Sequence, residues 1–567
     1  MRRKAGAVGV HERSWITIRE LNREPIHMKK LLALGMALLM STSAIGTAAA
    51  QATNNNPLSD VRVRQALAYA IDMQTIIDTI FDGNAIKAVG MLPNGPFKNP
   101  DLNPYDYDPD KARELLKEAG WDSNRTLEMV YYYDDQITAN LMQALQAYFA
   151  DVGVNMNARL LTGDVAKTLG AIPPNPTDKS LVSWDLGYGA RAAIVMQEYY
   201  NDYATGKASS DQFPGTPEMD AAIAATNAST DPQKQKEAFF AIEKLMNDNV
   251  YTIPLYYQKL YTVESDRLNR NGAPYGNEQF NYNWDIQNWT VEADASGKHV
   301  FYTNGAPVDY FEHPWANLGL WVGNRFVFDR LLFANPTMTG VAGGDLAETY
   351  TISDDGKTVT LTLRDNIKWH DGEPITVDDV TWSFEAALFV PNLHGVVGKT
   401  LNSLEGAADY VAKKAEHISG ISTEGNTITL KFATLDPNVL ISLSQFAPLP
   451  KKYFEGTDPT VLQQNAFWQK PVGSGPFKVD TVAFGDYASL LPFDDYFLGK
   501  PKIDQVVAFA SADGDVNMVK NAAANRIDFA ITKVTSDVKA LEEMPHMKLT
   551  PMDIPYTRMM WINTYDK

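Results

Sequence analysis

Cysteine is absent from the 567-residue chain. Without a thiol the protein can form no disulfide, no thiolate metal site, no cysteine nucleophile and no lipid-modified cysteine anchor. Its eight histidines show no HxH or HExxH spacing, which argues against a zinc site, and there is no GxSxG elbow or GxxxxGK[ST] phosphate loop. We therefore expect no catalytic residues, no metal and no cofactor.

Positive charge is also scarce. The chain has a formal net charge of −19, and its first 52 residues carry eight basic and three acidic side chains, so the remainder stands at −24. A body this acidic repels the phosphates of nucleic acids and anionic membrane surfaces. We therefore expect no nucleic-acid partner.

Long hydrophobic runs are limited to one, near the N-terminus. Two lysines are followed by apolar residues from Leu31 to Met40 and then by small residues, which is typical of a signal peptide over 28–52. The run is too short to remain as a membrane span. Residues 1–27 make no sense before such a signal, and we interpret them as spurious upstream translation. We expect an exported, periplasmic protein with no lipid anchor.

The rest of the chain mixes helix and strand patterns without strict alternation, which indicates an α/β or α+β protein of two or three domains. Asp108, directly before a proline, predicts a helix start, and Asp354–Lys357 predicts a turn between two alternating strands. Thr376 with Asp379 three residues later predicts a capped helix. The small polar run 292–298 is the best linker candidate.

Four stretches carry a family resemblance when they are taken together. They are "LAETYTISDDGKTVTLTLRDNIKWHDGEPITVDDVTWSFEAAL", "PVGSGPFKVDTVAFGDYASLLPFDDYFLGKPKIDQVV", "PLSDVRVRQALAYAID" and "YDPDKARELLKEAGW". They resemble the bacterial extracellular solute-binding proteins of family 5, the peptide/nickel class that delivers ligands to ABC importers. The resemblance implies an α/β, two-lobed periplasmic-binding-protein fold of type II with an extra subdomain, acting as a monomer that passes its ligand to a permease in the inner membrane.

The order of these stretches differs from that of the family, in which the last two follow the first two. Joining "RMMWINTYDK" to "NNNPLSDVRVRQAL" restores the usual order, so we interpret the chain as a circular permutation. The predicted divisions are a distal lobe at 57–255, a main lobe at 256–345 and 472–567, an extra subdomain at 346–471, and a linker at 292–298 that joins the old termini.

The permutation bears on the hinge that the family implies. The junction of "NTYDK" with "NNNPLSD" resembles one of two chain crossings between the lobes, and Tyr251–Tyr257 resembles the other. If only the second crossing is covalent, the open state is freer and closure costs more ordering entropy, so we expect a looser hinge.

Binding residues are inferred from two further stretches. In "WDLGYGARAA", Arg191 stands where peptide-binding members of the family carry an aspartate, and Tyr188 stands in for an aromatic residue. A cation there favours a carboxylate or a hydroxyl-rich ligand, unless Arg191 is a solvated loop residue. The stretch "VDYFEHPWANLGLWVGNRF" resembles the first cleft segment, whose aromatic residues stack on ligands or belong to the core. The residues predicted there are Tyr310, Phe311, Trp315, Trp321, Asn324 and Arg325, with Trp561 and Asn563 beside the hinge as weaker candidates.

The sequence thus predicts the substrate-binding component of an ABC importer, which captures a peptide-sized solute between two lobes. An oligosaccharide is the alternative ligand, and a nickel chelate is less favoured. From other classes, a secreted glycosidase is the enzyme alternative and a scaffold protein the structural one. The carboxylate pairs at 354–355 and 494–495 lie in turn contexts, which do not favour the glycosidase.

Overall fold

A computed structural model describes residues 54–207, 211–273, 285–316, 318, 326–335, 338–510 and 516–567. The residues from 54 onward form one compact unit. The predicted leader at 1–27 and signal peptide at 28–52 lie outside the described residues. Across the described part of the chain, no helix combines the length and the apolar character that a membrane crossing needs.

The first half of the described chain alternates helices with short strands. Its elements are α2 (Val61–Tyr69), α3 (Met73–Ile80), β1 (Ala85–Lys87), α4 (Pro109–Glu118), β2 (Thr126–Tyr131), α5 (Gln136–Asp151), β3 (Asn155–Leu160), α6 (Val165–Gly170), β4 (Leu186–Ala192), α7 (Pro217–Thr226), α8 (Pro232–Asn249) and β5 (Thr252–Ser265).

The second half is richer in strands. Its elements are β6 (Leu268–Asn269), β7 (Thr290–Val291), β8 (Val300–Asn304), β9 (Leu332–Ala334), β10 (Val341–Gly344), β11 (Ala347–Ile352), β12 (Thr358–Leu363), α9 (Val377–Ala387), α10 (Gly395–Asn402), α11 (Ala407–Val411), β13 (Ile421–Glu424), β14 (Thr427–Lys431), α12 (Val439–Gln445), β15 (Phe477–Ala483), β16 (Tyr487–Pro492), β17 (Gln505–Phe509), α13 (Val516–Ala523), β18 (Phe529–Thr532), α14 (Thr535–Glu542) and β19 (Met547–Ile562).

Local sequence explains several of these boundaries. The carboxylate of Asp108 accepts a hydrogen bond from the backbone N–H of Lys111 and so caps α4, as predicted. Thr376 and Asp379 form the predicted capping box at the start of α9. The predicted hairpin is confirmed as β11 and β12, which pair antiparallel.

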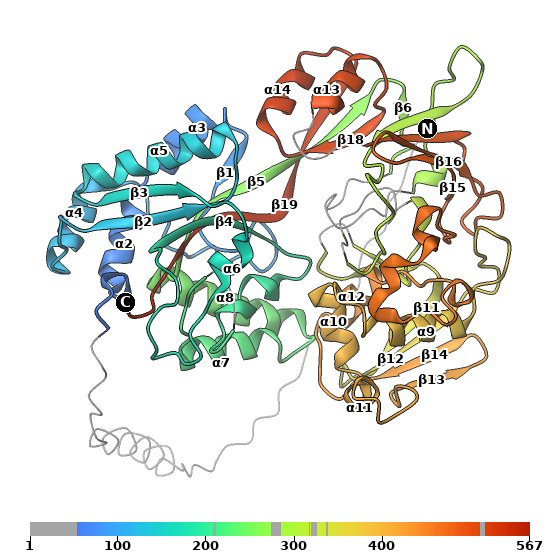
Figure 1. The fold of residues 1–567 in the computed structure, drawn as a ribbon, viewed down its shortest axis with the longest axis horizontal. Coiled ribbons are helices and arrows are strands. Elements are labelled where there is room, and N and C mark those ends of the chain that lie inside the picture. The colour runs from blue at the N-terminus through green and yellow to red at the C-terminus, as the bar shows by residue number, and fades with distance from the viewer. Residues whose placement is uncertain are drawn as a thin grey trace, which may run out of the picture. The chain divides into compact units, whose positions relative to one another are not determined.

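One mixed sheet connects the two halves of the fold. In the described residues it has eleven strands in the order β15-β16-β17-β8-β18-β5-β19-β4-β2-β3, with β1 paired to β5. The strands β2, β3 and β4 are parallel at one end, while β17, β8 and β18 are parallel in the other half. A separate four-stranded antiparallel sheet, β11-β12-β14-β13, forms a subdomain with α9 to α12. This is the α/β, two-lobed architecture that the sequence predicts (Figure 1).

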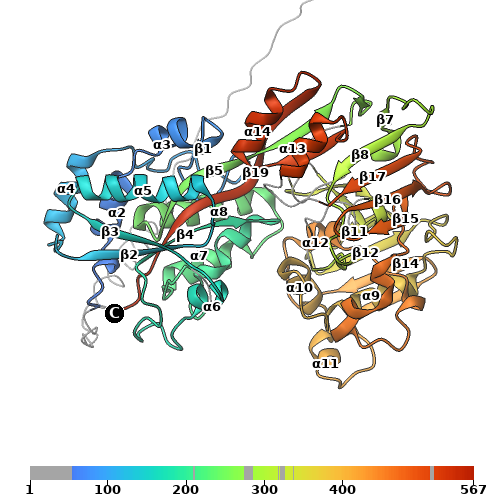
Figure 2. The same cartoon turned by 45° about the horizontal axis from the view of Figure 1, so that its top comes forward.

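Helices cover both faces of the sheet around β4. Figure 2 shows α3 and α5 on one side of β2, β3 and β4, and α7 and α8 on the other. The cores agree, because Tyr188 and Met560 pack with residues of α3 and α5, whereas Met559 and Trp561 pack with residues of α7 and α8. Adjacent residues of β19 therefore contribute to different cores, as the alternation of a strand requires.

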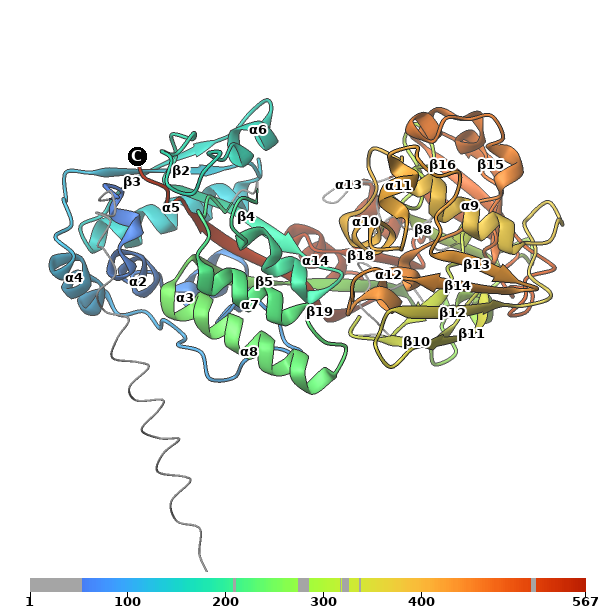
Figure 3. The same cartoon turned by 90° about the horizontal axis from the view of Figure 1, so that it is seen from below.

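The first lobe holds β2, β3 and β4, and the second holds β8, β15, β16 and β17 together with the subdomain. The two lobes are connected by β5 and β19, which lie side by side and pass between them (Figures 1 and 3). Their pairing is interrupted between Asp553 and Thr557 of β19, opposite Lys259 and Tyr257 of β5. Pro555 lies in this interruption and cannot donate a ladder hydrogen bond. The ladder between the two connecting strands is therefore broken at this point, while both strands are covalently continuous through it.

The prediction that residues 563–567 and 54–60 form one of the two crossings is wrong. Asn54 donates to the carbonyl of Thr564 at 3.0 Å, and Asn563 donates to the carbonyl of Trp184 at 3.0 Å. Both contacts lie past the end of β19 that pairs with β4, inside the lobe that contains β4. The expected loss of a covalent crossing, and with it the looser hinge, does not apply.

Candidate functional site

A cavity of about 790 Å³ lies between the two lobes. One wall comes from β4 and the chain up to α7, and the other from α10 and the turn before α12. Figure 3 shows α10 and α12 on the side of their subdomain that is nearer to β4 and α7. The lining residues are Arg191, Ala192, Val195, Glu198, Asn201, Asp202, Ala204, Lys207, Ile223 and Asn227 on the first wall, and Gly395, Val396, Lys399, Leu435, Asp436 and Asn438 on the second.

Lys399 of α10 links the walls of this cavity. Its ammonium donates to the side-chain carbonyl of Asn227 at 2.8 Å, across the gap, and lies 3.5 Å from the carboxylate of Asp436 on its own side. Asp436 is buried and also accepts a hydrogen bond from Thr400 at 2.6 Å. Lys399 is thus held on one lobe by a carboxylate while it contacts the other lobe through a neutral amide.

Arg191 lies at the end of β4 with its guanidinium engaged inside the lobe. It contacts the carboxylates of Asp202, at 2.6 Å, and of Asp211, and it donates to the carbonyl of Glu198 at 3.0 Å. Burial alone would lower the pKa of Arg191, but Asp211 and Asp202 raise it above its ordinary value. Two carboxylates surround one cation, so Arg191 does not present the free positive charge expected from its position in the sequence.

Glu198 is the other acid on this wall. Its carboxylate accepts the backbone N–H groups of Ile194, at 2.7 Å, and Val195, at 3.1 Å. Burial raises the pKa of Glu198, and the two backbone hydrogen bonds oppose that shift. The side chain therefore holds the turn after β4 in place.

A second, smaller cavity of about 320 Å³ shares Val195 and Asn438 with the first. Its other lining residues are largely apolar and include Phe97, Met196, Pro232, Met338, Ile352 and Leu440. A mainly apolar lining with a few polar groups is typical of ligand pockets.

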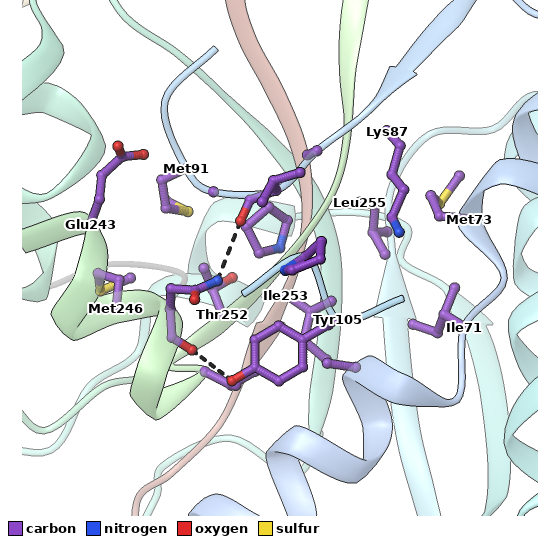
Figure 4. Close-up of a pocket in the computed structure, with 18 residues that line it drawn as sticks. Ile71, Met73, Lys87, Met91, Tyr105, Glu243, Met246, Thr252, Ile253 and Leu255 are labelled. Carbon is purple, nitrogen blue, oxygen red and sulfur yellow. Dashed lines mark hydrogen bonds between the residues drawn. The ribbon is translucent and has the colours of Figure 1, made fainter. Parts of the chain in front are cut away.

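A third cavity, of about 50 Å³, lies inside the first lobe and is lined mainly by apolar side chains (Figure 4). Tyr105 and Asn247 close one side, where the Tyr105 hydroxyl donates to the Asn247 carbonyl and the Asn247 amide donates to the carbonyl of Val89. The space is enough for a few water molecules and far too small for a peptide-sized solute.

The predicted residues of β4 and β19 have distinct places. Arg191 lines the interlobe cavity. Tyr188 is buried on the opposite face, and its hydroxyl is 2.8 Å from that of Tyr256. Trp561 is buried against Gly187 and Gly189 of β4, where a Cβ on Gly189 would be 2.0 Å from the indole ring.

The predicted residues of the 308–326 stretch are not brought together at the cavity. Phe311 and Trp315 are buried in the core of the second lobe, and the indole N–H of Trp315 donates to the carbonyl of Ala447 at 2.8 Å. Tyr310 is exposed. Asn563 is fully buried beside Trp184. Trp321, Asn324 and Arg325 lie outside the described residues.

Sequence reasoning missed Asp202, Asp211, Lys399 and Asp436. Each lies in or next to a polar turn or at a helix surface, and their partners are remote in sequence: Lys399 is 172 residues from Asn227. The turn "LDPN" at 435–438 was the one local signal, because an aspartate before a proline often organises a turn.

Comparison with known proteins agrees with this architecture. The model of the bacterial extracellular solute-binding proteins, family 5 (middle region), matches residues 23–217 and 342–567. These two stretches make up well over half of the sequence. The chain belongs to this family of extracellular solute-binding proteins.

Individual relatives match over shorter lengths. A Brucella ovis protein, named as a peptide-binding protein of an ABC transporter, is 29% identical over 187 residues, which are 33% of this chain and 32% of that protein. The oligopeptide-binding protein OppA of Lactococcus lactis subsp. cremoris is 26% identical over 246 residues, which are 41% of this chain and 40% of OppA. The matches thus span a third to two fifths of these curated relatives.

Among solved structures, the oligopeptide-binding protein AppA of Bacillus subtilis, in complex with a nonapeptide, is 25% identical. The match covers 44% of this chain and 46% of AppA with a TM-score of 0.36.

Proposed function

We propose that this chain is the solute-capturing component of an ABC importer and that it binds a peptide-sized solute in the interlobe cavity. The observation that carries the proposal is a cavity of about 790 Å³ whose walls come from different lobes of a family 5 solute-binding protein. Relatives named as peptide-binding proteins support a peptide as the ligand.

The lining suits a peptide better than a sugar. It mixes apolar side chains with charges of both signs, including Asp202, Lys207 and Lys399, and none of the described residues that line it carries an aromatic ring. Sugars are commonly held by stacking on aromatic rings, whereas peptides present an ammonium, a carboxylate and a backbone that needs polar partners. The oligosaccharide alternative is therefore less favoured.

A glycosidase is also less favoured, because the carboxylates of this cavity are occupied. Asp202 contacts Arg191, Asp436 contacts Lys399 and Thr400, and Glu198 accepts two backbone N–H groups. A glycosidase needs one carboxylic acid and one carboxylate free to face the sugar ring. We propose that the chain binds and releases its solute without chemical change.

Capture would follow from closure of the lobes about the irregular point of β5 and β19. A solute that contacts both walls binds the closed form better and shifts the population toward it. The permease would then recognise the closed form. Export to the periplasm, as predicted from 28–52, would place the protein where such a permease collects its ligand.

We also propose that the chain order is a circular permutation of the family's usual order. Two observations support it. Residues 54–56 are hydrogen-bonded to residues 563–566, and the predicted linker 292–298 is a tight turn in which Asp294 and Lys298 are joined by a backbone hydrogen bond of 2.8 Å. The function would survive such a change, because the cavity walls do not include either region.

The test is calorimetric titration of the purified protein with pools of short peptides and, separately, with oligosaccharides. Native mass spectrometry of protein isolated from the periplasm would identify any ligand that copurifies. We expect saturable peptide binding that is weakened about tenfold in Lys399→Ala, which removes the contact between the walls. Lys234→Ala, on the exposed surface of α8, is the matched control and should bind like the parent. Binding of oligosaccharides alone, or equal binding by both variants, would overturn the assignment.

A further inference from the structure

A second arginine of the sheet, Arg558, lies on the face opposite to Arg191. In the β4–β19 ladder, Arg191 pairs with Thr557 and Ala190 pairs with Arg558. Successive residues of a strand point to opposite faces. Arg191 therefore faces the interlobe cavity, while Arg558 shares a face with Met560, on the side covered by α3 and α5.

Arg558 is surrounded by tyrosines. Its guanidinium carbon is 4.1 Å from the ring centroid of Tyr133, 5.2 Å from that of Tyr556 and 6.0 Å from that of Tyr188. A second cation lies over the ring of Tyr556: the Lys533 ammonium is 5.0 Å from the Tyr556 ring centroid. Aromatic faces stabilise a cation, but they supply no acceptor for its N–H groups.

The hydrogen bonds of Arg558 are incomplete. Its Nε donates to the side-chain carbonyl of Gln258 at 2.9 Å. Within the described ranges, the two Nη groups have no acceptor and no carboxylate forms an ion pair with Arg558. By contrast, buried Arg64 donates to the carbonyls of four residues. The side chain of Arg558 is partly exposed, and its nitrogens are not among the fully buried atoms that lack a hydrogen-bond partner. Solvent therefore reaches the guanidinium.

The neighbouring tyrosines add further donors. The hydroxyls of Tyr188 and Tyr256 are 2.8 Å apart, and those of Tyr132 and Tyr133 are 3.0 Å apart. A hydroxyl pair uses one of its two hydrogens internally and leaves the other to donate elsewhere. Guanidinium and hydroxyl donors thus gather on this face. The charge of Asp135 also acts on the hydroxyls of Tyr188 and Tyr256, but among the described residues it forms no ion pair with Arg558. Donors that lack a protein acceptor are normally completed by a ligand or water.

We propose that the Arg558 cluster, made of Arg558, Tyr133, Tyr188 and Tyr256, is a binding site for an oxyanion. The two Nη groups of an arginine match the two oxygens of a carboxylate, or two oxygens of a phosphate, in a bidentate contact. Lys533 places a second cationic side chain beside Tyr556. This site lies on the opposite sheet face from the interlobe cavity and does not depend on its solute.

The experiment is a calorimetric titration of the full chain with succinate and, in a separate arm, with inorganic phosphate, at constant ionic strength set with chloride. We expect saturable binding of at least one anion, and the two arms show whether carboxylate or phosphate is preferred. In Arg558→Gln the affinity should fall by about tenfold or more, because the variant loses both the positive charge and the two parallel N–H donors of the guanidinium. Arg526→Gln is the matched control, since Arg526 also lies over an aromatic ring, at 4.3 Å from the centroid of Phe509, but on the exposed surface.

Two further variants keep the test decisive if Arg558→Gln does not fold. Arg558→Lys keeps the positive charge but cannot make a bidentate contact, and Tyr133→Phe removes a hydroxyl while keeping the ring. Each should weaken anion binding while the circular dichroism spectrum stays that of the parent. The proposal is overturned if neither anion binds the parent saturably, or if the folded Arg558 variants bind as tightly as Arg526→Gln.

Discussion

The side-chain amide of Asn56 donates a hydrogen bond to the backbone carbonyl of Asn563, which is 507 positions away in the sequence, with nitrogen and oxygen 2.7 Å apart. The same amide donates to the carbonyl of Tyr565 at 2.8 Å, and its oxygen accepts from the N–H of Leu58. Asn56 is 1% exposed, so no water can replace these contacts. One side chain therefore joins two chain segments that the sequence keeps far apart.

Replacing Asn56 should loosen this connection. In Asn56→Ala two buried carbonyls and one N–H lose their partner, and we expect the free energy of unfolding to fall by about 1–3 kcal/mol. Urea denaturation measures it. Asn55→Ala is the control, because among the described residues Asn55 bonds only through its backbone N–H, to Asp566. Equal stability of the two variants would show that the Asn56 contacts are dispensable.

If the chain order is the permutation proposed above, restoring the family's order should leave the fold intact. A variant in which residue 567 is joined to residue 54 by a short linker, with the chain opened within 292–298, keeps every strand of the large sheet. Because 54–56 already contact 563–566, we expect a melting temperature within a few degrees of the parent and unchanged peptide affinity. A variant that folds but has lost the solute affinity would count against permutation as a neutral rearrangement.

Local patterns in the sequence predicted the elements well, because caps, turns and alternation act over a few residues. Asp108 and Thr376 cap helices, and residues 354–357 form the turn of a hairpin, as predicted. The cavity was not predictable in this way, since Arg191 meets Asp211 and Lys399 meets Asn227 only after the chain folds. Nor can a pattern tell a stacking tryptophan from a core one, as Trp315 demonstrates by packing on Phe446.

Arg191 should matter more for stability than its position at a cavity suggests. In Arg191→Gln, Asp211, which is 1% exposed, loses its cation, and breaking such a buried pair costs about 3–5 kcal/mol. Asp202→Asn should cost under about 1 kcal/mol, because that carboxylate is 46% exposed and screened by solvent. Thermal denaturation of both variants compares them. A mild effect of Arg191→Gln would mean that Asp211 is satisfied by its bond from Tyr203.

Gly189 should be intolerant of any side chain. A Cβ at this position would be 2.0 Å from the ring of Trp561, so Gly189→Ala must displace the indole from a packed core. Overpacking of this kind costs about 1–3 kcal/mol. Gly343→Ala is the matched control, since Gly343 is also in a strand and a Cβ there would meet nothing within 4 Å. The difference between the two in urea denaturation, together with the near-ultraviolet signal of tryptophan, tests this packing.

The buried Glu243 of α8 should make stability depend on pH. Burial raises its pKa to about 7, although the N–H groups of Asn99 and Leu92 and the charge of Lys98 act in the opposite direction. A carboxyl whose pKa is higher in the folded than in the unfolded state stabilises the fold fully below its ordinary value near 4.5, and this contribution is lost as pH rises toward 7.

Glu243→Gln removes this titration while keeping one acceptor for the two N–H groups. We expect the free energy of unfolding of the variant, relative to the parent, to rise between about pH 5 and about pH 8 by up to roughly 3 kcal/mol. Comparing the two proteins at each pH cancels all other titrations. Stability curves that stay parallel across that range would place the pKa of Glu243 near its ordinary value, and the carboxylate would then be charged in the folded protein and held by Leu92, Asn99 and Lys98.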